Sequence, residues 1–166
     1  MMTFVLTLAV ALQAPDSARA LRWERALNET TDSLDRVRGA AAAFRVDLGN
    51  ASHDLVLVRA AQVRATCRAA DAPLQALEQL LTDEVYDRNA RSAQERLRSG
   101  TTELRRTLSR CQREWQAGAR PTTSGADSLR AWGPYRTAQL DAALRRYLGL
   151  ARSFMKQASL KKPAVS

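Results

Sequence analysis

Apolar residues along most of the chain recur at alternating spacings of four and three, the pattern of helices that pack side by side. Three such seams span residues 23–48, 56–81 and 97–115. Either Asn50 or Ser52 can cap the second helix, because both side chains accept hydrogen bonds from free backbone N–H groups. Matched lengths and short connections predict an all-α fold: an antiparallel up-down bundle of about four long helices with coiled-coil-like seams.

Four sites along these patterns are able to interrupt a helix. Pro73 lacks a backbone N–H, yet the apolar phase continues through it, which predicts a kink or a short break in the second helix near Pro73. Gly100 weakens the third helix and could form a turn, and residues 117–126 have the composition of a loop. Gly133-Pro134 bends or interrupts the last helix, whose wide apolar face covers residues 140–155. No segment recurs at a fixed period, which disfavours an array of helical repeats.

The N-terminus has the features of a signal peptide. Residues 4–12 form an uncharged, largely apolar run of the length of a signal-peptide core. Ala18 and Ala20 then place small side chains at the −3 and −1 positions of a cleavage site, and Ala14 marks a second candidate site. Residues 1–3 carry no basic side chain, which departs from the usual pattern, and the alternative is an apolar N-terminal helix in a cytosolic protein.

The expected organisation is therefore a signal peptide over residues 1–20, a single helical-bundle domain over residues 21–160 and a disordered tail over residues 161–166. A chain of 166 residues is of ordinary size for one domain. No apolar run is long enough for a usual transmembrane helix.

The charge balance favours anionic partners. The formal net charge is +9, and 23 of the 26 basic residues are Arg. An Arg- and Ala-rich, Lys-poor composition is also typical of a GC-rich bacterial genome, which explains the preference for Arg over Lys but leaves the charge in place.

The two cysteines, Cys67 and Cys111, both fall on core seams. Their midpoint is residue 89, inside the polar gap at 86–90 between the second and third seams. If the chain folds back there, both cysteines lie at the same height on neighbouring antiparallel helices, and we expect a disulfide in an oxidising compartment. The alternative is a pair of buried free thiols.

The search for catalytic chemistry is negative. His53 is the single histidine, next to Ser52 and Asp54 at a helix start, so one chain cannot supply a multi-histidine metal site. Nucleophile elbows, phosphate-binding loops, dinucleotide fingerprints and haem-attachment motifs do not occur. We therefore expect a protein that is not an enzyme and that has no metal or cofactor.

The basic C-terminal part is the best candidate for binding. Residues 126–166 carry a net charge of +6, two thirds of the total, and include aromatic residues among the basic ones. Such a helix can contact an anionic membrane surface or envelope polymer. The alternative is a core-facing helix with a solvated Arg face. The candidate residues are Arg136, Arg145, Arg146, Arg152 and Lys156.

The sequence thus indicates an exported bundle with a structural or binding role in the bacterial cell envelope. One alternative is a cytosolic basic helical protein that binds nucleic acid or a partner coiled coil, although export disfavours nucleic acid. Another is a carrier of a small apolar ligand, with Trp23, Trp115 and Trp132 lining its cavity. Exposed remnants of the seams would also allow a homo-oligomer.

Overall fold

The computed structural model describes residues 14–48, 51–118 and 123–160, and all regular structure in these residues is α-helical. The all-α bundle predicted from the seams is confirmed. The helices are α1 (Ala14–Asp47), α2 (His53–Ala69), α3 (Asp71–Asp83), α4 (Arg91–Gly118) and α5 (Thr123–Gln157).

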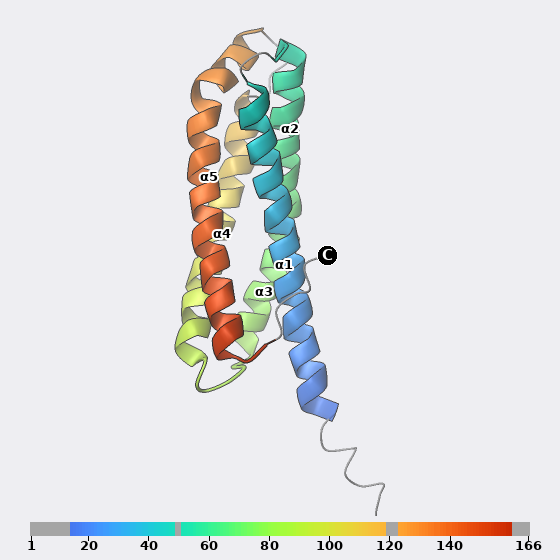
Figure 1. Cartoon of the computed structure of the whole chain (residues 1–166), viewed down its shortest axis with the longest axis vertical. Coiled ribbons are helices and arrows are strands. Elements are labelled where there is room, and N and C mark those ends of the chain that lie inside the picture. Colours follow the sequence, from blue (N-terminus) through green and yellow to red (C-terminus); the bar gives the residue numbers. More distant parts are fainter. Residues whose placement is uncertain (1–13, 49–50, 119–122, 161–166) are drawn as a thin grey trace, which may run out of the picture.

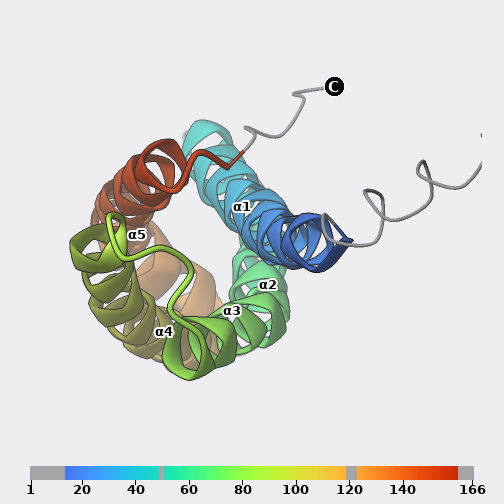
Figure 2. The ribbon, with the colours of Figure 1, turned by 90° about the horizontal axis from the view of Figure 1, so that it is seen from below.

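Four rods run alternately up and down, and α2 and α3 together make the second rod (Figure 1). Seen from one end, the rods form a ring in which α4 lies between α3 and α5, and α1 closes the ring (Figure 2). The packing agrees with this order, since α1 contacts α2, α3 and α5, while α4 contacts α2, α3 and α5. The long neighbouring pair α4 and α5 therefore shares one side of the molecule.

The seams form the core of the bundle. Every residue that the 4-3 spacing selects between Trp23 and Trp115 is buried, except Leu48, which is partly exposed. Thr30 and Thr101 occupy seam positions and are buried as well; Thr101 bonds the carbonyl of Leu97 at 2.8 Å. Burial of one apolar stripe per helix is the main favourable term for such a fold.

The second rod has a short break near Pro73. Of the kink or short break expected near Pro73, the structure has a short break, because α2 ends at Ala69 and α3 begins at Asp71. Pro73 lacks the N–H that would bond the carbonyl of Ala69, and its ring crowds that carbonyl. Helix α2 therefore ends at this point. Ser52 caps its start, as one of the two expected candidates, and accepts a hydrogen bond from the N–H of Leu55 at 3.2 Å.

At the three other candidate sites, the described residues form a continuous helix or leave a shorter loop. Gly100 lies inside α4, and Gly133-Pro134 lies inside α5. The loop expected over residues 117–126 is shorter, because α4 extends to Gly118 and α5 begins at Thr123. The tail expected at 161–166 lies outside the described residues.

The N-terminal part of α1 is tied to the segment that joins α3 to α4. The Glu84 carboxylate accepts hydrogen bonds from Arg19 at 2.8 Å, from Arg22 at 2.9 Å and from the Trp23 indole at 3.0 Å. Arg19 also donates to the carbonyl of Val85. A chain cleaved after Ala20 would lose the Arg19 contacts and keep the other two, whereas a chain cleaved after Ala14 would keep all of them.

Gly133 allows α5 to approach α1 closely. A Cβ atom at this position would come within 2.4 and 2.6 Å of the Phe44 ring, which is buried and packs edge-to-face on Trp115 with ring centroids 4.7 Å apart. Because that ring has little room to move, Gly133→Ala should destabilise the protein by about 1–3 kcal/mol through overpacking. Alanine's better helix propensity, worth about 1 kcal/mol, offsets part of this loss.

Urea unfolding measures this difference. The matched control is Gly39→Ala in α1, where a new Cβ has no neighbour within 4 Å. That variant should gain up to about 1 kcal/mol. Equal gains at both positions would show that α5 does not approach Phe44 as closely as described.

Candidate functional site

A groove of about 460 Å³ lies on the surface between α4 and α5. Its floor is made of side chains that also belong to the core, namely Cys111, Trp115 and Leu140. Ala142 and Ala143 stand on its α5 side, and their short side chains leave the space open. The groove therefore forms where α4 and α5 pack tightly at the core but carry small side chains toward the surface.

Arginine dominates the rim of the groove. Arg106 and Arg110 extend from α4, and Arg136 and Arg146 from α5. Two glutamates also line it, which leaves a net charge of +2.

The arginines on this rim differ in how they are paired. Arg136 is half-buried, donates to the side chain of Gln139 at 3.1 Å and lies 3.5 Å from the Glu114 carboxylate. Arg106, Arg110 and Arg146 are exposed, and within the described residues none of them makes a hydrogen bond or ion pair. Three guanidinium groups from facing helices are thus available to a ligand.

The five basic residues that the sequence proposed fall on different sides of α5. Arg136 and Arg146 line the groove, whereas Arg145, Arg152 and Lys156 do not. Arg145 bonds Asp141 at 2.7 Å, and Arg38 of α1 reaches the same carboxylate at 3.3 Å. The structure therefore does not bring the five together as one patch.

Asp141 is held ionised by this pairing with Arg145 and Arg38. Partial burial acts to raise the pKa of Asp141, but hydrogen bonds from the two arginines outweigh it and hold the pKa below its usual value. On the side of α5 that faces α1, the basic side chain of Arg145 is thus already paired with a carboxylate, unlike the exposed arginines of the groove.

Arg106 and Arg110 were missed by the sequence reasoning. They are spaced four apart on α4, a spacing that places two side chains on one helix face. That signal was present, but the sequence does not show which face of α4 lies beside α5.

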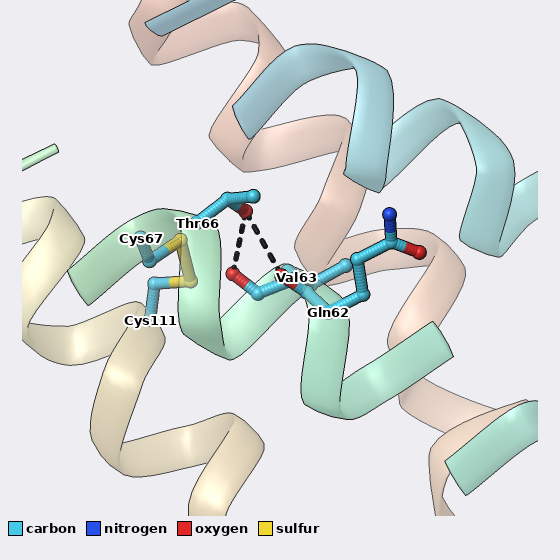
Figure 3. Close-up of a disulfide and its surroundings, with 5 residues drawn as sticks. All are labelled: Gln62, Val63, Thr66, Cys67 and Cys111. Atoms are coloured by element: carbon cyan, nitrogen blue, oxygen red, sulfur yellow. Dashed lines mark hydrogen bonds between the residues drawn. A yellow bond between two sulfur atoms is a disulfide. The ribbon is translucent and has the colours of Figure 1, made fainter. Parts of the chain in front are cut away.

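The structure joins Cys67 of α2 to Cys111 of α4 in a disulfide with a Cα–Cα distance of 6.4 Å (Figure 3). Beside it, the Thr66 hydroxyl donates to the carbonyls of Gln62 at 3.1 Å and Val63 at 2.9 Å, so this polar group is satisfied within α2. Because Cys111 lies on the floor of the groove, the bond ties the α4 wall to α2.

The other candidate residues lie elsewhere. His53 begins α2 and lies 3.5 Å from the Asp127 carboxylate, with half of its side chain exposed. The indoles of Trp23 and Trp115 are buried against neighbouring aromatic rings, and Trp115 and Trp132 pack edge-to-face at 5.0 Å.

The described residues contain neither a metal-binding cluster nor a membrane-spanning helix. In these parts of the chain no group of three or more His, Cys, Asp or Glu side chains is placed to hold a metal ion. Within the same residues, no helix combines the length and the apolar character needed to cross a bilayer.

No protein-family model, curated protein or solved structure matches this chain.

Proposed function

We propose that the protein is an exported helical bundle of the bacterial cell envelope that binds an anionic ligand in the groove between α4 and α5. The ligand carries a phosphate or carboxylate group, which the guanidinium groups of Arg106, Arg110 and Arg146 receive. The role is binding, and no step of covalent chemistry is assigned to the site.

One observation carries this proposal: three exposed arginines from two facing helices line one concave surface, and none of them has a partner among the described residues. Like charges held near one another repel, and an anion between them relieves that repulsion. A guanidinium group presents its N–H donors in a fork that matches the oxygens of phosphate and carboxylate. The opposite side of α5 lacks this property, because Arg145 is already paired with Asp141.

Export is supported by two independent features. The Cys67–Cys111 disulfide belongs to an oxidising compartment, since cytosolic thiols are kept reduced. The apolar run at residues 4–12 has the form of a signal-peptide core. Either cleavage point leaves Trp23 and the whole groove in the mature chain.

Calorimetric titration with inorganic pyrophosphate tests the binding role. At about 20 mM salt the protein should bind this anion, and raising the salt to about 200 mM should weaken binding, because ions screen exposed charges. Arg146→Gln should weaken binding by about fivefold to tenfold, the effect of losing one partly solvated charge-assisted contact.

The matched control is Arg152→Gln, which removes the same charge from the same helix outside the groove. This variant should change the Kd by less than about twofold, because a distant exposed charge is screened. Absence of pyrophosphate binding, or equal losses in the two variants, would contradict a site in this groove.

A further inference from the structure

The arginine-lined groove continues into an apolar half. A second hollow of about 350 Å³ lies next to it between the same helices and shares Glu103, Thr107, Ala143 and Arg146 with it. We call the part lined by Gly100, Leu104, Tyr147 and Leu150 the apolar half. Arg146 thus stands where the charged part of the groove meets the apolar part.

The apolar half is lined mainly by carbon atoms, and Leu104 and Tyr147 are largely buried beneath it. The Tyr147 hydroxyl is buried and bonds Thr101 at 3.0 Å, so the polar end of this side chain is already occupied in the core. Burial also raises the pKa of Tyr147, which keeps the phenol neutral. Leu150 is only partly buried and leaves part of its side chain in contact with water.

Gly100 lets Leu150 of α5 lie close to the α4 backbone. A Cβ atom at this position would lie 2.6 Å from Cδ1 of Leu150 and 3.6 Å from Cδ2 of Tyr147. Glycine weakens the interior of a helix, yet here it stands near the middle of α4. Its lack of a side chain is what allows Leu150 to pack there, so a side chain added at this position has to displace Leu150.

We infer that the ligand is an anionic amphiphile with a single alkyl chain. Its head group binds Arg106, Arg110 and Arg146, and its chain lies in the apolar half along Leu104, Tyr147 and Leu150. This inference rests on the proposed function and adds the ligand class. A charged end and an apolar end in one continuous groove complement such a molecule, whereas a free inorganic anion would leave the apolar half exposed to water.

A flat membrane surface fits this geometry less well. The arginines stand around a concave groove, and the other basic residues of α5, among them Arg145 and Arg152, lie outside it. A bilayer surface would instead favour basic side chains on one convex face.

Titration with a series of alkyl phosphates, from methyl to octyl and below their micelle concentrations, tests the inference. Each added methylene should tighten the Kd by about twofold, roughly half of the free energy of full burial, because the groove is open on one side. Octanol, which has the chain without the charge, should bind at least about tenfold more weakly than octyl phosphate.

Two variants separate the head group from the chain. Gly100→Leu adds a large side chain to the apolar half and displaces Leu150, and should abolish the tightening of the Kd with chain length. Leucine favours the helix more than glycine does, whereas the displacement of Leu150 opposes the change, so circular dichroism and urea unfolding are used to check that the variant stays folded. The control Gly39→Leu adds the same side chain to α1, where a new Cβ has no neighbour within 4 Å, and should keep the full dependence.

The possible outcomes distinguish this inference from the proposed function. If pyrophosphate binds but a longer alkyl chain does not tighten binding, the inference of an amphiphilic ligand is wrong and the proposed anion site stands. If neither pyrophosphate nor any alkyl phosphate binds, both the inference and the proposed function are wrong. Binding to phosphatidylglycerol vesicles that Gly100→Leu leaves unchanged and Arg152→Gln weakens would indicate a membrane surface and overturn the inference.

Discussion

Replacing Cys67 and Cys111 together by alanine should lower the free energy of unfolding by about 4 kcal/mol. The two residues are 44 positions apart, and the disulfide closes a loop that contains α3 and the connection to α4. Loop-closure entropy for a ring of this size gives the stated loss, because the cross-link removes extended conformations from the unfolded chain. A marginally stable domain has only about 5–15 kcal/mol in all, so the change is large.

Urea unfolding of the oxidised protein, the reduced protein and the double variant measures this loss. Reduction should reproduce most of the effect of the double variant, since both open the same loop. The single variant Ala60→Gly, at another buried position on α2, serves as a control for a local change in that helix. A difference below about 1 kcal/mol between oxidised and reduced protein would show that the bond adds little to the bundle.

Trp23→Ala should cost about 3–5 kcal/mol, the usual range for removing a fully buried large aromatic side chain. The indole is 0% exposed, and its ring packs on Tyr86 and Phe154 with centroids 5.5 and 5.4 Å away. Its Nε1–H also donates to the Glu84 carboxylate at 3.0 Å. The variant would therefore leave a cavity and remove one of the hydrogen-bond donors to Glu84.

Two control variants divide this effect into its parts. Trp23→Phe keeps most of the packing and loses the hydrogen bond, and should cost about 1–2 kcal/mol. Leu21→Ala, two residues earlier and 62% exposed, should change stability by less than about 0.5 kcal/mol. Equal losses at Trp23 and Leu21 in chemical denaturation would contradict the docking of this end of α1.

The core of the fold was predictable from spacing alone. A 4-3 repeat identifies the buried stripe of a helix without knowledge of its partners, which is why Trp23, Leu74 and Trp115 were all placed correctly. The approach of Cys67 to Cys111 followed from the same logic, because an antiparallel hairpin places equal distances from its turn side by side.

The helix ends were less predictable, because tertiary packing overrides local preference. Pro134 should weaken α5, yet the helix continues through it. Its neighbours hold the helix in place: Gly133 lies against Phe44, and the Thr137 hydroxyl bonds the carbonyls of Gly133 at 3.0 Å and Pro134 at 2.9 Å. At Pro73, in contrast, the helix is interrupted, and α2 and α3 are separate helices.

The groove could not be predicted from the sequence, for a different reason. It depends on how α4 and α5 are rotated about their axes, which decides that Arg106 faces Arg146 while Arg145 turns toward Asp141 and Arg38. Spacing within one helix fixes which residues share a face. It does not fix which faces of two helices border the same hollow.

Nuclear magnetic resonance mapping of the bound anion tests the central claim most directly. Amide signals of ¹⁵N-labelled mature protein would be followed during titration with inorganic pyrophosphate at low salt. We predict that the largest shifts fall on residues 103–114 of α4 and 136–146 of α5, with little change around Arg152 and Lys156. Shifts spread evenly over the basic surface, or centred away from these two segments, would contradict a binding site between α4 and α5.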